Sequence, residues 1–208
     1  MATIATTGTE TEPETGAKPE FPPHRMTIDR YERLVEAGVY GPKDPVFLWK
    51  GRLVEKMTTG NRHNFSLTSL QRLMIEHVPG GWFVRQEQPI ALSESSMPEP
   101  DLTVVRGVPR DYLDRSVAAR DVGLVVEVSD RGLAIDSRSV LRAYAAEGIP
   151  VYWIVNIPKA RIDVHGDPTG PPESAHYREH RAYGPDDEIP VFLDGREVGR
   201  IAVRDVLP

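Results

Sequence analysis

Residues 122–128 read Val-Gly-Leu-Val-Val-Glu-Val, and residues 151–155 read Val-Tyr-Trp-Ile-Val. Both runs are strand-sized and almost entirely apolar, as expected of strands that are buried on both faces of a sheet. The segment 136–147 between them has apolar residues at helical spacing, namely Val140, Leu141, Tyr144 and Ala145. A strand, a helix and a second strand in this order predict a parallel strand pair joined by a helical crossover.

The flanking segments extend this unit in both directions. Upstream, hydrophobic period and turn residues predict helices at 27–36 and 63–77 and strands at 46–49, 53–57, 82–90 and 101–105. Downstream, short strands are predicted at 161–165, 176–183, 191–193 and 198–203. We therefore expect an α/β fold with a mixed sheet, a helix on each face, a central order of helix, three strands, helix and strand, and extra β hairpins.

Length and composition limit the classes of protein that fit. The chain has 208 residues, which suits one ordinary domain, and no cysteine, which excludes disulfides, thiolate zinc sites and a cysteine nucleophile. No apolar run reaches the roughly 18–20 residues of a membrane span. Residues 1–22 are rich in Thr, Glu, Pro and Gly, so we expect a disordered acidic tail followed by a single domain at 23–208.

The net charge of −6 argues against a general nucleic-acid coat protein, which would normally be basic. However, the tail holds four glutamates and one lysine, and so carries half of this charge. The folded part is close to neutral, which leaves room for an enzyme with a local nucleic-acid contact. The start of the chain lacks the basic and apolar regions of a signal peptide, so a cytoplasmic location is expected.

Two carboxylates stand out by their positions. Asp101 opens a strand after Pro100, and Glu127 lies near the end of the most apolar strand. An anion there is costly to bury unless a cation compensates it. Two such acids on adjacent strands would suit Mg²⁺ or Mn²⁺, which prefer oxygen ligands. The alternative is structural: Glu127 paired with an arginine and Asp101 serving as a turn residue.

Several segments in order resemble the Uma-type putative restriction endonuclease family of the PD-(D/E)XK nuclease superfamily. The matching residues run from about Thr27 to His165 and are most specific at 99–105, 124–128, Asp136, 144–145, 148–150 and 152–156. The resemblance implies a restriction-endonuclease-like core of helix, three strands, helix and strand. It also implies that Asp101 and Glu127 bind the metal, with the backbone carbonyl of Val128 as a third ligand.

One residue of the family pattern is missing. The superfamily motif places a lysine two residues after the glutamate, where this chain has Ser129. Uma-type proteins usually place it on the next helix, at the position of Val140. A lysine ammonium would orient the attacking water and offset phosphate charge, and valine does neither. Arg138 and Arg142 are each two helical positions away and should face elsewhere, while Lys56 would serve only if the early hairpin folds over the site.

Three further residues are candidates for the site, each with a simpler explanation. Asp136 matches a family carboxylate, but it also suits a helix N-cap. His63 matches a family histidine, although a histidine at a helix start is commonly a surface or capping residue. Glu55 lies in a short strand, where a solvated face is the simpler interpretation and the family context adds a site-facing alternative.

The sequence thus predicts a metal-dependent endonuclease-like protein that hydrolyses DNA phosphodiester bonds, weakened by the missing lysine. Its catalytic residues would be Asp101, Glu127, Asp136, His63 and Glu55. The alternative is a catalytically inactive module of the same fold that binds DNA or a partner protein. A membrane partner is not expected, and a homodimer is, because many nucleases of the superfamily are dimers.

Overall fold

The fold is described from a computed structural model, which describes residues 23–41, 44–56, 59–130 and 137–208. The predicted tail at 1–22 and the candidate Asp136 lie outside the described residues. No helix in the described part of the chain is long and apolar enough to cross a membrane.

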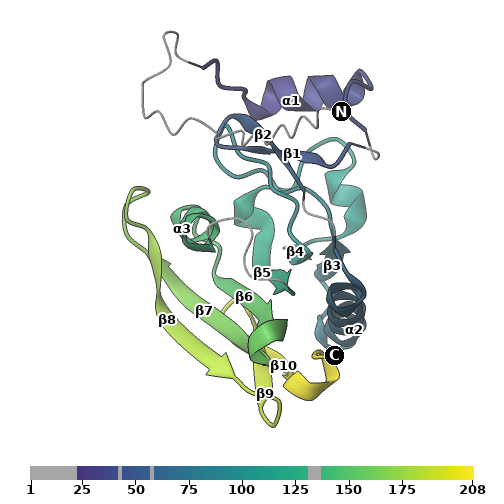
Figure 1. The fold of residues 1–208 in the computed structure, drawn as a ribbon, viewed down its shortest axis with the longest axis vertical. Coiled ribbons are helices and arrows are strands. Elements are labelled where there is room, and N and C mark those ends of the chain that lie inside the picture. The colour runs from purple at the N-terminus through teal and green to yellow at the C-terminus, as the bar shows by residue number, and fades with distance from the viewer. Residues whose placement is uncertain (1–22, 42–43, 57–58, 131–136) are drawn as a thin grey trace, which may run out of the picture.

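The helices and strands of the described chain follow one another in the predicted order (Figure 1). The helices are α1 (Ile28–Glu36), α2 (Asn61–His77) and α3 (Ser137–Ala146), with short 3₁₀ turns η1 (Pro109–Tyr112), η2 (Ala119–Asp121), η3 (Ile157–Lys159) and η4 (Val203–Asp205). The strands are β1 (Val46–Trp49), β2 (Arg52–Glu55), β3 (Trp82–Gln86), β4 (Leu102–Arg106), β5 (Val122–Ser129), β6 (Val151–Asn156), β7 (Arg161–Thr169), β8 (His176–Tyr183), β9 (Glu188–Leu193) and β10 (Arg196–Ala202).

A six-stranded mixed sheet is the centre of the molecule. Its strands lie in the order β3-β4-β5-β6-β7-β8, and two separate hairpins are formed by β1 with β2 and by β9 with β10. β5 and β6 are parallel, while the other neighbours in the sheet are antiparallel. The mixed α/β fold, the parallel pair and the extra hairpins are therefore confirmed.

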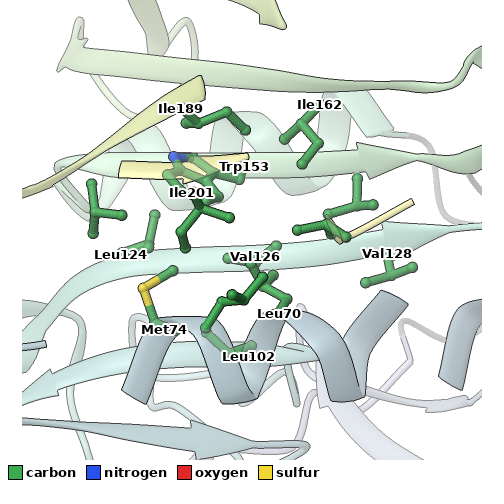
Figure 2. Close-up of a cluster of buried hydrophobic side chains, with 14 of the residues drawn as sticks. Leu70, Met74, Leu102, Leu124, Val126, Val128, Trp153, Ile162, Ile189 and Ile201 are labelled. Atoms are coloured by element: carbon green, nitrogen blue, oxygen red, sulfur yellow. The ribbon is translucent and has the colours of Figure 1, made fainter. Parts of the chain in front are cut away.

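The two faces of the sheet are covered by different helices. On one face, α2 and the β9-β10 hairpin enclose a core that includes Leu70, Met74, Val126 and Trp153. Figure 2 shows Leu70 and Met74 of α2 directed at the side chains of the sheet. On the other face, α3 packs against the sheet through a second core built around Tyr144 and Tyr152. The predicted helix on each face is thus observed, and it leaves β5 buried on both sides.

Local sequence explains where α1 begins and ends. The side chain of Thr27 accepts a hydrogen bond from the amide of Arg30, which is the expected N-cap interaction. After the helix, Gly38 has φ of +70°, a conformation that favours glycine. This helix packs through Tyr31 against Leu48 of β1 and Met97.

Several predicted strands end earlier in the structure, and the largest difference is at 82–90. The strand expected at 82–90 ends at Gln86, because Glu87 has φ of +48° and its amide bonds to the carbonyl of Asp101. The left-handed conformation of Glu87 directs the chain away from the hydrogen bonds between β3 and β4. The loop that follows leads back to Pro100 and Asp101 at the start of β4, and so the turn helps to shape the candidate site.

Candidate functional site

Asp101 lies at the edge of the central sheet, immediately before β4. Its Oδ2 atom accepts a hydrogen bond of 2.6 Å from the backbone amide of Val128 in β5. The side chain keeps 16% of its exposed area, so the carboxylate is largely but not fully enclosed. Asp101 therefore joins the start of β4 to the end of β5, where Glu127 is located.

His63 in the first turn of α2 contacts the same carboxylate. Its Nε2 atom lies 3.1 Å from Oδ2 of Asp101, and the residue is only 5% exposed. The hydrogen bond to Asp101 is the main cause that raises the pKa of His63, while burial acts in the opposite direction. A surface or capping position for His63 is therefore wrong, because the helix brings the imidazole onto Asp101.

Glu127 projects from β5 toward α3. Its Oε1 atom accepts a hydrogen bond of 2.9 Å from the hydroxyl of Tyr144. Burial, and then the negative charge of Asp101, raise the pKa of Glu127 to about 8, although the bonds from Tyr144 and the Asp101 amide oppose this. Glu127 enters no ion pair in the described part of the chain, so the arginine pairing considered as the structural alternative is not observed there.

The backbone of Val128 also faces Asp101. The N–H and C=O groups of one strand residue point to the same side of the strand. Since the Val128 amide bonds to Asp101, its carbonyl is directed toward the same edge, beyond the last β4–β5 pair of Leu102 and Val126. The carbonyl and the two carboxylates therefore converge on one end of two neighbouring strands.

These groups have the chemistry that a hard divalent cation requires. Oδ2 of Asp101 is already engaged by His63 and Val128, which leaves Oδ1 for another partner. A cation between Asp101 and Glu127 would offset the repulsion that raises the Glu127 pKa. No cluster of three or more Asp, Glu, His or Cys side chains of metal-binding type occurs among the described residues, so the donor set includes at most two carboxylates there.

The other two candidate residues are not added to this group. Glu55 ends β2 as an exposed residue opposite Val46, and it makes no hydrogen bond or ion pair with any residue that the structure describes. Asp136 lies outside the described residues, so neither its capping role nor its site role is decided.

The two expected lysine positions are occupied by residues that pack. Ser129 is 6% exposed at the end of β5, and Val140 of α3 contacts the core around Tyr144. Val140 precedes Tyr144 by four residues, so both lie on one face of α3. Because Tyr144 reaches Glu127, a longer side chain at position 140 would extend over the same region.

A positive charge approaches the site from the hairpin instead. Lys56, directly after β2, forms an ion pair with Glu99, which is two residues before Asp101. The hairpin thus does fold against the segment that carries Asp101. Lys50, in the turn of the same hairpin, donates a hydrogen bond of 2.8 Å to Ser139 of α3. Spacing along the chain does not predict these partners, because the contacts join segments that are far apart in the sequence.

Tyr144 is the site neighbour that sequence reasoning missed. Its spacing marked it as an inward-facing residue of the helix, but not as the hydrogen-bond partner of Glu127. The sequence does contain a signal for this contact. Tyr144 lies on the buried face of the helix that packs across the strand containing Glu127. A buried tyrosine hydroxyl needs a polar partner, and this strand offers few.

Comparisons with known proteins identify the family and the fold of the chain. The family model described as Uma2, putative restriction endonuclease, matches residues 28–203. A solved structure described as a putative nuclease belonging to DUF820, from Anabaena variabilis, is similar with a TM-score of 0.62 at 14% sequence identity, over 87% of this chain and 97% of that chain. At this identity the likeness shows the fold alone. No curated protein matches the chain.

Proposed function

Because this chain belongs to the Uma2 family of putative restriction endonucleases, we propose that it is a metal-dependent endonuclease that hydrolyses phosphodiester bonds in DNA. The observation that carries the proposal is the pair of carboxylates, Asp101 and Glu127, at the shared end of β4 and β5. Their mutual repulsion and the burial of Glu127 favour a bound cation at this point.

In this proposal Asp101, Glu127 and the carbonyl of Val128 hold Mg²⁺ or Mn²⁺. A cation held by these groups would supply charge stabilisation to a phosphate and would make a nearby water more acidic. His63 acts as a positioning residue, because its bond to Oδ2 fixes the Asp101 carboxylate and leaves Oδ1 for the ion. Tyr144 likewise orients Glu127. Asp136 remains a further candidate ligand, and Glu55 has the weakest support because it is exposed.

Lys56 is our candidate for the missing positive charge. Its ion pair with Glu99 holds the ammonium near the segment that carries Asp101. An ammonium there would offset the charge of a bound phosphate. Glu99 would compete with the substrate phosphate for this ammonium. This competition agrees with the prediction of a weakened enzyme.

A second function is favoured by one specific observation. Val140 packs into the core where the family lysine would extend toward Glu127. A chain without that ammonium could retain the fold and bind DNA or a partner protein without cleaving it.

Cleavage of plasmid DNA with Mg²⁺ or Mn²⁺ tests the enzyme proposal. We expect Asp101→Asn and Glu127→Gln each to lower the cleavage rate by at least about 100-fold, because metal charge stabilisation is worth several kcal/mol. Asp186→Asn, which removes an exposed carboxylate from a turn, is the control and should cleave like the wild type. Equal cleavage by all four proteins would contradict the site, and no cleavage by any of them would favour the binding module.

A further inference from the structure

A hollow outside the candidate site lies on the same face of the sheet as Glu127. It has a volume of about 540 Å³ and is lined by residues of α3, β6, η3, β7 and β8, and of the segment before β8. Figure 1 shows α3 crossing beside β7 and β8. The strand register places Glu127 opposite Ile154, and Ile154 opposite Asp163 of the hollow. Ile154 also lines the hollow, so the hollow begins one strand away from Glu127, and Asp163 lies two strands away, or roughly 10 Å.

The hollow and the site also share one edge of the sheet. β5 and β6 run in parallel, with Ser129 opposite Asn156, and Asn156 is opposite Arg161 of β7. Asn156 and Arg161 both line the hollow. A chain molecule that lay along this edge over Glu127 would thus pass over Arg161.

The lining of the hollow is rich in positive charge. It includes Arg138, Arg142, Lys159 and Arg161, against the two acids Asp163 and Glu173. Arg142 and Lys159 are exposed, and neither forms an ion pair with any residue in the described ranges. This local balance is opposite in sign to the net charge of −6 of the whole chain.

A buried carboxylate holds one arginine of the hollow in place. Asp163 is 5% exposed, and Nε of Arg161 donates to its Oδ2 at 3.1 Å while Nη2 lies 3.0 Å from Oδ1. This side-on pairing leaves the Nη1 donors of the guanidinium to bind another anion. Nε2 of His180 lies 3.1 Å from Oδ1 of the same carboxylate, and its ring stacks on His165 at 4.5 Å.

We propose that this hollow binds a backbone phosphate of the nucleic acid a few nucleotides from the bond at Asp101 and Glu127. The identity of the ligand rests on the proposed function. Arginine recognises phosphate with a planar set of donors, and Arg161 is oriented in advance by Asp163. Arg142 of α3 and Lys159 of η3 extend the positive surface beyond Arg161. Proteins that bind single-stranded nucleic acid follow its backbone with positively charged grooves of this kind. Binding at the hollow would depend on the charge of the phosphate and would be independent of the base sequence.

The test is the salt dependence of DNA binding, measured by fluorescence anisotropy of a labelled duplex in EDTA so that no cleavage occurs. For the double variant Arg142→Gln/Lys159→Gln we expect weaker binding and a salt slope smaller by about 0.9 for each phosphate that the protein no longer neutralises. The matched control is Arg110→Gln/Arg204→Gln, which removes the same charge from exposed residues of η1 and η4. Its slope should equal that of the wild type.

A second variant separates geometry from net charge. Arg161→Gln/Asp163→Asn removes one positive and one negative charge, and it leaves no unpaired carboxylate in the sheet. We expect it to weaken binding and lower the salt slope although the net charge is unchanged. Far-UV circular dichroism would verify its folding.

The outcomes distinguish this inference from the proposed function. Slopes of the hollow variants equal to that of the control, or no binding by the wild type at low salt, would overturn the inference, whatever the cleavage assay shows. Binding that depends on the hollow, together with no cleavage under Mg²⁺ or Mn²⁺, would uphold the inference and reject the enzyme.

Discussion

Glu127 is the residue whose protonation links the site to stability. Its pKa is raised from 4.5 to about 8 by burial and by Asp101. At pH values between 4.5 and about 8, the folded chain keeps a proton on Glu127 that the unfolded chain has released. The free energy of unfolding therefore falls as the pH rises, and this loss is complete above about pH 8. A bound cation would replace the proton and remove this loss.

We therefore predict that the melting temperature in EDTA falls more steeply between pH 5 and pH 9 for the wild type than for Glu127→Gln. Mn²⁺ should raise the melting temperature of the wild type mainly at the upper end of that range. The pKa of His63 is also raised, so His63 lowers the stability of both the wild type and Glu127→Gln as the pH rises. The difference in melting temperature between the two proteins therefore reports on Glu127. Parallel curves would contradict the raised pKa. Circular dichroism during heating provides the measurement.

Among the elements, α3 carries the most direct test of the missing lysine. Val140 lies one turn before Tyr144, whose hydroxyl bonds to Glu127. We predict that Val140→Lys increases Mg²⁺-dependent cleavage by at least tenfold, because it restores an ammonium next to the carboxylates. Stability should fall somewhat, since Val140 packs against the core.

Val140→Met is the matched control for that change, because it adds length without charge. Plasmid cleavage at equal protein concentration compares the three proteins. A similar rate in the lysine and methionine variants would show that charge at position 140 does not limit the reaction.

The β9-β10 hairpin is held against α2 by a close contact at Gly199. A Cβ atom at this position would lie 2.7 Å from the ring of His77 at the end of α2. We predict that Gly199→Ala costs about 1–3 kcal/mol of the free energy of unfolding, as overpacking does. At Gly80 a Cβ would meet nothing within 4 Å, so Gly80→Ala should cost nothing. Urea denaturation measures both variants, and equal stability would argue against this docking.

At the scale of the molecule, the elements and their order could be predicted well from the sequence. The strands β5 and β6 were found because their apolar runs are long, and α2 because its apolar residues repeat with a helical period. The end of β3 was missed because it depends on the left-handed conformation of Glu87, which has no marker in the sequence. The homodimer stays a prediction.

The site could be predicted only in part. That Asp101 and Glu127 lie close together was predicted from their positions at strand ends and from the family resemblance. The bond between His63 and Asp101 depends on how α2 docks on the sheet, and spacing along the chain does not determine this. The contact of His180 with Asp163 was also missed, because it joins two strands at positions 17 residues apart.

The pairing of Asp101 with the amide of Val128 spans 27 residues of chain. It requires β4 and β5 to lie side by side, and contacts between residues so distant in the chain carry the loop-closure entropy that slows folding. A chain in which β4 and β5 have not paired would therefore have these carboxylates apart. Under the proposed function, a chain emerging during synthesis would therefore cut DNA only after β4 and β5 have paired.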